Sequence, residues 1–162
     1  WTKERAELFY YSDSFFPGTI YALTLRERNL DLRTPKDTHG KIVCNPLGYG
    51  DFGILAELIK NKEVVRVSPR TMTQCFKMLV VGRVDFIASG VNDYNSGLEK
   101  SGISPDRVNI EDLIIFESKL HLIVSKSNPN ATKIIDAFNR GLKIFSASDE
   151  FVRLKTNFEW NE

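Results

Sequence analysis

Long apolar runs, net charge, cysteine and histidine are all scarce in this sequence of 162 residues. No apolar run approaches the ~20 residues that a transmembrane helix needs. Lysine and arginine total 22, against 21 for aspartate and glutamate. A chain so close to neutral lacks the basic surface that nucleic acid or a polybasic membrane anchor would require, so we expect no nucleic-acid partner.

The two cysteines and two histidines indicate little metal chemistry. Cys44 falls in a predicted strand and Cys75 in a predicted helix, and both resemble core positions. Two buried thiols are the favoured interpretation, and a disulfide between them is the alternative. His39 and His121 stand alone, and no Cys/His cluster has the spacing of metal ligands. We therefore predict neither a metal site nor a cofactor.

The composition can fill a core, since 42% of the residues are apolar and 11% are aromatic. Short apolar runs rich in β-branched residues predict strands. These strands are expected at residues 20–25, 42–44, 64–67, 84–88, 110–116 and 120–124. Helical patterns separate several of them, and such alternation predicts an α/β fold with a largely parallel sheet. The length allows one large domain or two small ones.

Helix boundaries can also be predicted. Ser68 and Pro69 have the residue types of an N-cap and a first helical position, and Gly82 would end that helix. A later helix is predicted to begin after Asn128 and to end at Gly141. Two further segments carry no clear period: a linker at residues 26–39 and a loop at residues 89–97.

Residues 40–60, GKIVCNPLGYGDFGILAELIK, form the most informative stretch. They predict a short strand, a proline- and glycine-containing loop, and a helix with Asp51 placed as its cap. Gly48 and Gly50 would let the backbone approach a ligand, and the free N–H groups of the helix's first turn would face it. An ordinary strand-to-helix turn is the alternative. By spacing alone it is favoured, because a pair of glycines is weak evidence.

Ligands of open α/β sheets bind beyond the carboxyl ends of the strands. Two predicted loops qualify, residues 46–50 and residues 89–92, and we expect both to face one crevice. This position predicts a site without naming its ligand.

Four segments follow one another along the chain: TKER with YSDSFF, then GKIVCNPLGYG, GRVDFIASG and LHLIVSKSNP. They are similar to a T-x-x-R … F-S-x-P-Y segment, a G-K-x-V-x-V-x-x-G-x-G segment, a G-R-x-D-A-V segment and a returning strand. In this order and spacing they resemble the family 3 periplasmic solute-binding proteins, the polar amino-acid type of ABC transporter. The resemblance covers nearly the whole chain.

The resemblance implies a two-lobe α/β fold of the periplasmic-binding-protein type. Residues 25–117 would form a complete second lobe, and residues 1–24 and 118–162 part of a first lobe whose remainder lies upstream of Trp1. It further implies a monomer that binds a small polar solute, amino-acid-like or carboxylate-bearing, in an interlobe cleft. The partners would be the membrane subunits of an ABC importer, and the location periplasmic or otherwise extracytoplasmic.

Individual roles follow from the matched positions. The resemblance implies that Arg5 clamps a ligand carboxylate, a task suited to its planar fork of donors. Read without the resemblance, Arg5 would instead form a surface ion pair with a neighbouring glutamate. The other predicted ligand-binding residues are Tyr49 and Gly50 at the carboxylate, Ser89 and Gly90 at the ammonium, and Asp51 beside the loop.

The sequence departs from the family at the ammonium position. Family members that bind amino acids commonly have an aspartate where Gly90 stands, because a desolvated ammonium needs a counter-charge. Ser89 offers only a neutral hydroxyl, and strand geometry does not require Asp93 to return to the site. We therefore expect ordinary α-amino acids to bind weakly or not at all.

Two other functions are compatible with the same fold. One is the extracytoplasmic sensing domain of a receptor. The other is an enzyme, because fold does not determine function. We find no nucleophile–base pair at recognisable spacing and no metal motif, so we expect a binding protein rather than an enzyme.

Overall fold

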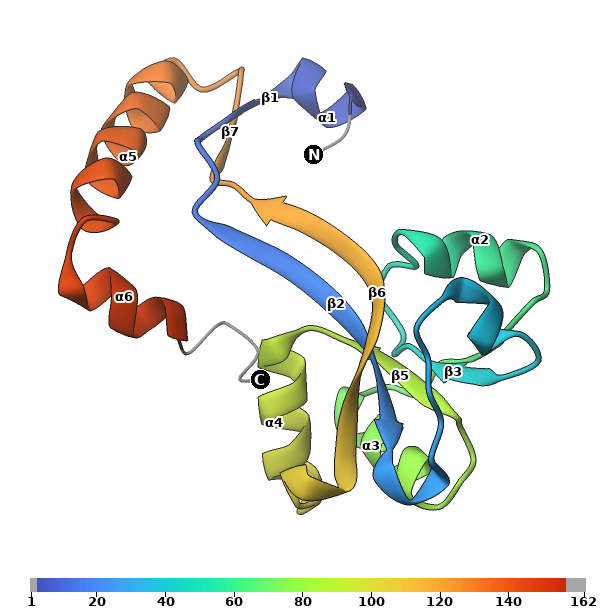
Figure 1. Cartoon of the computed structure of the whole chain (residues 1–162). Coiled ribbons are helices and arrows are strands. Elements are labelled where there is room, and N and C mark those ends of the chain that lie inside the picture. Colours follow the sequence, from blue (N-terminus) through green and yellow to red (C-terminus); the bar gives the residue numbers. More distant parts are fainter. Residues whose placement is uncertain (1–2, 157–162) are drawn as a thin grey trace. The chain divides into compact units, whose positions relative to one another are not determined.

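The computed structural model describes residues 3–156, and the chain divides into two compact units. One unit is Thr19–Glu117, and the other combines residues 1–18 with residues 118–162. The two long strands β2 (Phe16–Leu25) and β6 (Val108–Leu120) run across the two boundaries (Figure 1). The first boundary falls at Thr19, earlier than the predicted Leu25, because Tyr21 to Leu23 of β2 pair with a strand of the Thr19–Glu117 unit.

A mixed five-stranded sheet forms the centre of the Thr19–Glu117 unit, in the order β4-β3-β5-β2-β6. Strand β3 (Ile42–Cys44) runs parallel to both β4 (Val65–Val67) and β5 (Phe86–Ser89), as the strand–helix alternation predicts. Strand β2 pairs antiparallel with β5, with Ala22 opposite Ala88. Because β3 and β5 are parallel neighbours, their carboxyl ends meet at one edge of the sheet.

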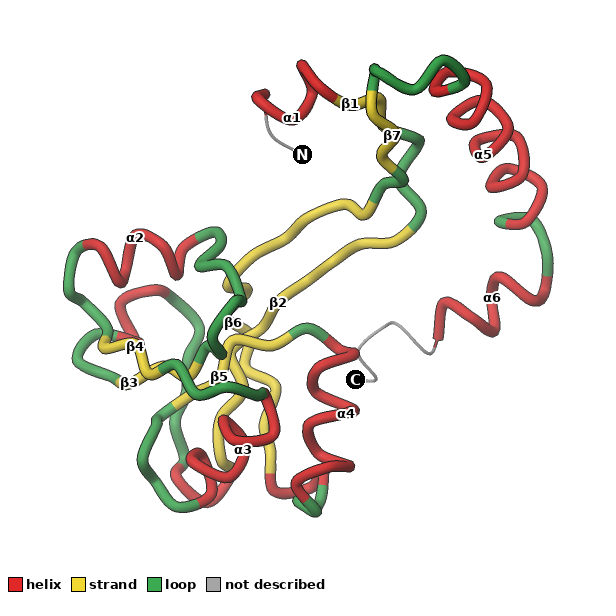
Figure 2. Tube along the Cα trace, turned by 180° about the vertical axis from the view of Figure 1, so that it is seen from behind, coloured by secondary structure: helices red, strands yellow, loops and turns green. Residues whose placement is uncertain are grey.

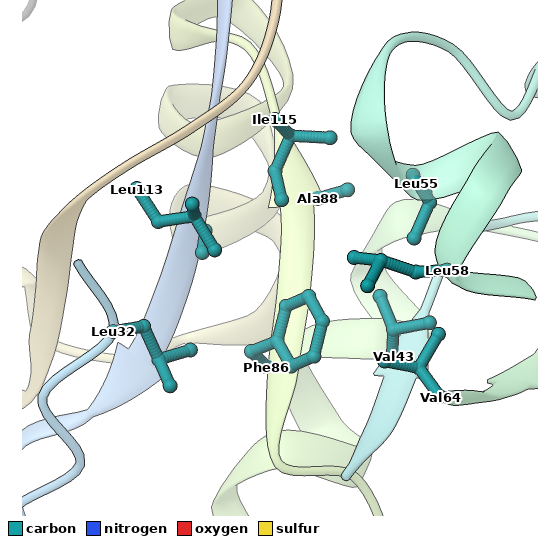
Figure 3. Close-up of a cluster of buried hydrophobic side chains, with 10 residues drawn as sticks. Leu32, Val43, Leu55, Leu58, Val64, Phe86, Ala88, Leu113 and Ile115 are labelled. Carbon is teal, nitrogen blue, oxygen red and sulfur yellow. The ribbon is translucent and has the colours of Figure 1, made fainter. Parts of the chain in front are cut away.

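Side chains alternate across this sheet and produce two apolar layers. On one face Val43, Phe86 and Ala88 pack with helix α2 (Ile54–Lys60) through its buried Leu55 and Leu58 (Figure 3). The intervening residues of the same strands point to the opposite face. There α3 (Met72–Val80) and α4 (Val91–Ser101) pack on each other, and Phe76 of α3 lies against Gly97 of α4. The central strand β5 is therefore buried on both faces, which accounts for its apolar sequence.

A disulfide joins β3 to α3. Cys44 and Cys75 are bonded, with their Cα atoms 5.6 Å apart and both residues fully buried. The favoured prediction of two free thiols is therefore wrong, although both residues do lie in the core. Helix α3 packs against strand β3 at these two residues, and the spacing of the cysteines in the sequence does not predict that contact.

Three other expectations for the Thr19–Glu117 unit need correction. Helix α3 begins at Met72 and not near Ser68, because Thr71 caps it and forms a reciprocal capping box with Gln74. The predicted loop at residues 89–97 is mostly helical, since Ser89 ends β5, Gly90 is the N-cap and residues 91–97 belong to helix α4. The predicted linker at residues 26–39 is pinned to the sheet: Leu32 is 1% exposed, and its N–H donates to the buried carboxylate of Glu111 at 2.9 Å.

The other unit is smaller in its described part. Strands β1 (Phe9–Tyr11) and β7 (Ile123–Ser125) form an antiparallel pair (Figure 2). Around them lie α1 (Lys3–Leu8), α5 (Ala131–Phe145) and α6 (Asp149–Thr156). Helix α5 continues through Gly141, where the sequence predicts its end. The ring of His121 hydrogen-bonds to the Ser12 carbonyl at 2.7 Å, in keeping with a structural histidine.

Neither a metal cluster nor a membrane-spanning helix is found within residues 3–156. In that range no group of three or more His, Cys, Asp or Glu residues is arranged to hold a metal ion. None of the helices there combines the length and apolarity that crossing a bilayer demands.

The disulfide provides a stability prediction. Because it closes a loop with a sequence separation of 31, replacing both Cys44 and Cys75 by alanine should lower the free energy of unfolding by about 3–4 kcal/mol. Urea denaturation should show the loss in the transition that unfolds the Thr19–Glu117 unit. As a control, alkylation of the unreduced, denatured protein should modify neither cysteine. Alkylation of both would contradict the disulfide.

Candidate functional site

The loop between β3 and α2, residues 45–53, is held in one shape by its own side chains. Asn45 is 3% exposed, and its Nδ2 donates to the Gly50 carbonyl at 3.2 Å and to Asp51 Oδ1 at 2.8 Å. The Tyr49 N–H donates to the Pro46 carbonyl at 3.1 Å and closes a tight turn. The loop is therefore ordered by internal bonds rather than only by its glycines.

Arg66 of β4 provides the strongest anchor for this loop. Its Nη1 bonds the Asp51 carboxylate, and its Nη2 lies 3.2 Å from the Tyr49 carbonyl and 3.3 Å from the Pro46 carbonyl. A single guanidinium thus satisfies several acceptors that the turn directs inward. Such charge-assisted bonds are among the strong ones in proteins. Residue spacing gives no signal for this role, because Arg66 lies on the next strand of the sheet.

Asp51 does not cap helix α2, contrary to the prediction. Its carboxylate accepts a hydrogen bond from Asn45 and forms a salt bridge with Arg66. The N-cap is Gly53, with φ of 56° and ψ of −134°, and a Cβ at that position would lie 2.3 Å from the Ile115 carbonyl. Glycine is therefore required there for both backbone and space. Asp51 shapes the loop, and its carboxylate points to Arg66.

A pocket of about 340 Å³ opens beside this loop within the Thr19–Glu117 unit. It lies at the shared edge where β3 and β5 end, and this is the location that the sequence predicts. Its volume is in the range of small-molecule sites. The lining residues are Ile20, Asn45, Gly48, Tyr49, Gly50, Phe52, Leu55, Ala88, Gly90, Asp93 and Ile115.

One hydrogen bond joins the loop to helix α4 at this pocket. The Tyr49 hydroxyl donates to Asp93 Oδ1 at 2.9 Å. Burial is the main cause that raises the pKa of the Tyr49 hydroxyl, and the hydrogen bond to Asp93 and its negative charge raise it further. The phenol is therefore neutral at physiological pH and remains a donor to the carboxylate. Asp93 reaches the pocket because residues 91–101 are helical and not the predicted loop.

The predicted site residues are thus partly brought together. Tyr49, Gly50 and Gly90 line the pocket. Ser89 is 1% exposed, and its hydroxyl donates to the Gly90 carbonyl at 3.0 Å. Arg5 lies with an exposed side chain in α1 of the other unit. The lining residues that the sequence does not predict include Phe52 and Asp93.

Comparison with known proteins identifies the fold. No protein-family model matches this chain, and no curated protein matches it by sequence. Among solved structures, a mutant of ArgBP from T. maritima has a TM-score of 0.73 at 19% identity, covering 96% of this chain and 65% of that one. The probable amino-acid ABC transporter extracellular-binding protein ytmK from Bacillus subtilis has a TM-score of 0.73 at 15% identity, covering 98% and 67%. The GluR0 ligand-binding core from Nostoc punctiforme, in complex with (L)-glutamate, has a TM-score of 0.68 at 18% identity, covering 98% and 68%.

These similarities confirm the predicted fold class, a mixed α/β fold of the two-lobe periplasmic-binding-protein type. They also agree with the resemblance of the four sequence segments. The chain spans only part of such a structure, since it covers 65% of the ArgBP chain.

The Arg66 anchor can be tested by hydrogen exchange. Replacing Arg66 by lysine keeps the charge but removes the planar fork, so the carbonyls of Pro46 and Tyr49 cannot both be satisfied as now. The amides of residues 47–50 should then exchange at least about tenfold faster, a loss of roughly 1.4 kcal/mol in local opening energy. The exposed Arg70, substituted by lysine in the same way, should leave these amides unchanged. Equal exchange in the two variants would contradict the anchoring role.

The Tyr49–Asp93 hydrogen bond leads to a prediction about the pKa of Tyr49, which is raised above its ordinary value. The native pKa is raised, so the stabilisation by this bond is complete below the ordinary tyrosine pKa of about 10 and is lost as pH rises through the native value. Replacing Asp93 by asparagine should lower the Tyr49 pKa, because the neighbouring negative charge is removed while the burial remains. Ultraviolet difference spectra of phenolate formation measure this, with Tyr49→Phe assigning the transition. Tyr94, whose pKa burial also raises, should be unaffected and serves as the internal reference.

Proposed function

We propose that this chain is a solute-binding module and that the pocket of the Thr19–Glu117 unit receives a small polar solute. The observation that most supports this proposal is where the pocket lies and how its loop is held. It lies beyond the carboxyl ends of two parallel strands, where open α/β sheets bind ligands. Its loop is held by Arg66 and Asn45, so the surface is organised before any ligand arrives.

The identities of the fold neighbours support an amino-acid-like or carboxylate-bearing ligand. They include ArgBP, an amino-acid ABC transporter binding protein and a ligand-binding core in complex with glutamate. The partners would accordingly be the membrane subunits of an ABC importer. A binding role is favoured over an enzymatic one for the same reason. The second candidate is an extracytoplasmic sensing domain, which would bind its ligand as the GluR0 ligand-binding core binds (L)-glutamate.

An extracytoplasmic location forms part of this proposal. The Cys44–Cys75 disulfide supports it, because disulfides persist in oxidising compartments such as the periplasm and the cell exterior. The ytmK neighbour, described as an extracellular-binding protein, supports it as well.

Arg5 keeps its proposed role at an anionic group of the ligand. A charge-assisted hydrogen bond of this kind contributes about 1.5–3 kcal/mol, so Arg5→Ala should weaken binding by about tenfold or more. The full chain is first screened by thermal shift against amino acids and simple carboxylates. Titration calorimetry then compares the best ligand on wild type and Arg5→Ala.

The exposed Arg140 of α5, replaced by alanine, is the matched control and should bind the ligand as the wild type does. If Arg5→Ala binds as tightly as Arg140→Ala, Arg5 is removed from the site while solute binding stands. If no solute shifts the melting temperature of the wild-type chain, the proposed function itself is contradicted.

A further inference from the structure

We propose that the pocket selects a solute carrying a cationic group, an ammonium or a guanidinium, and that Asp93 and Tyr49 receive it. This inference rests on the proposed function and adds the chemical class of the ligand. It also replaces the sequence-based expectation that ordinary α-amino acids bind weakly or not at all, an expectation that follows from the missing carboxylate at Gly90.

The charge of the pocket points to a cation. Among the lining residues that belong to the described range 3–156, Asp93 is the one that carries a charge. Its described hydrogen-bond partner is the neutral Tyr49 hydroxyl, and within residues 3–156 no salt bridge to Asp93 is found. The cation of the loop, Arg66, is engaged by Asp51 and by backbone carbonyls and does not line the pocket. A carboxylate without a counter-charge favours a cationic ligand and repels an anionic one.

Tyr49 leaves the carboxylate able to bind a second donor. The phenol occupies Oδ1, and an ionised carboxylate has about four lone-pair sites on its two oxygens. Oδ2 therefore keeps its capacity for a ligand N–H. The bond to Tyr49 limits the rotation of the Asp93 side chain, which makes Tyr49 a positioning residue for Asp93. Because the Tyr49 pKa is raised, this positioning bond is intact at neutral pH.

The remaining walls suit the carbon frame of such a ligand. Leu55, Ala88 and Ile115 present apolar surface, and all three are buried at the base of the pocket. Phe52 adds an aromatic wall that is held by stacking on Phe116, with ring centroids 5.3 Å apart. Aromatic faces beside a carboxylate attract alkylammonium and guanidinium groups. The pocket therefore fits a cationic group on a short apolar frame better than a bare carboxylate.

Four probes on the full chain test the charge requirement by titration calorimetry. L-arginine carries an α-carboxylate, an α-ammonium and a guanidinium. Relative to L-arginine, agmatine lacks the carboxylate and 5-guanidinopentanoate lacks the α-ammonium. Pentanoate keeps only the carboxylate and has no cationic group. The three guanidinium probes should bind and pentanoate should not. Asp93→Asn should weaken the three by about tenfold or more, the usual effect of losing a charged hydrogen-bond partner.

Glu99→Gln, at the exposed end of α4, is the matched control and should bind as wild type. Tyr49→Phe should weaken binding by less than Asp93→Asn, because the carboxylate remains and only its orientation is freed. Saturation of the wild type with agmatine should also lower the Tyr49 pKa, since a bound cation stabilises the phenolate. If Asp93 only supported the structure and did not receive the ligand cation, agmatine would leave the Tyr49 pKa unchanged. Circular dichroism confirms that each variant is folded.

The outcomes separate this inference from the proposed function. If pentanoate or another anionic or uncharged solute binds while the guanidinium probes do not, solute binding stands and the cation requirement is overturned. The cation requirement is also overturned if Asp93→Asn binds agmatine as tightly as Glu99→Gln does. If neither these probes nor the wider solute screen yields binding, both proposals fail together.

Discussion

The candidate site depends on one guanidinium, that of Arg66. A tight loop such as residues 45–51 turns several carbonyl groups to one side. Each of these carbonyls would destabilise the folded protein if it were buried without a hydrogen-bond donor. Arg66 reaches them from β4, where it lies opposite Val43 in the parallel ladder. It offers one nitrogen to Asp51 and the other to the Pro46 and Tyr49 carbonyls. The position of the Tyr49 ring, and hence one wall of the pocket, follows from an arginine that does not line the pocket.

The sheet holds the two halves of the pocket in fixed relation to each other. Cys44 immediately precedes the loop and is bonded to Cys75 of α3, so the end of β3 is tied to the helix layer. Helix α4 packs on α3 through Gly97 and Phe76, and α4 carries Asp93. The loop and Asp93 are therefore anchored to the same layer. The 2.9 Å bond between Tyr49 and Asp93 joins two supported elements and needs little additional ordering.

Much of this architecture can be predicted from the sequence because it is local. The apolar run of residues 42–44 predicts β3 to the residue, and Gly82 adopts the positive φ of 70° expected after a helix end. The failures involve long-range contacts. The segment VNDYNSG has a polar composition, and it is helical because Gly97 and Leu98 are buried by packing. The partners of Asp51 and Cys44 lie on other elements, and spacing does not report them.

At Gly90 the chain lacks the carboxylate that the family pattern has, and the negative charge of the pocket comes from Asp93 instead. Its φ of −87° and ψ of 166° are open to any residue, and a Cβ would meet only the Thr19 carbonyl, at an ordinary 3.7 Å. Neither backbone nor packing therefore requires a glycine. A carboxylate at position 90 would share the pocket with that of Asp93, and two neighbouring carboxylates disfavour each other's ionisation. A side chain there would also occupy volume that a ligand can use. A glycine at the end of β5 and an aspartate in the first turn of α4 thus form one consistent solution, in which the helix rather than the strand supplies the negative charge.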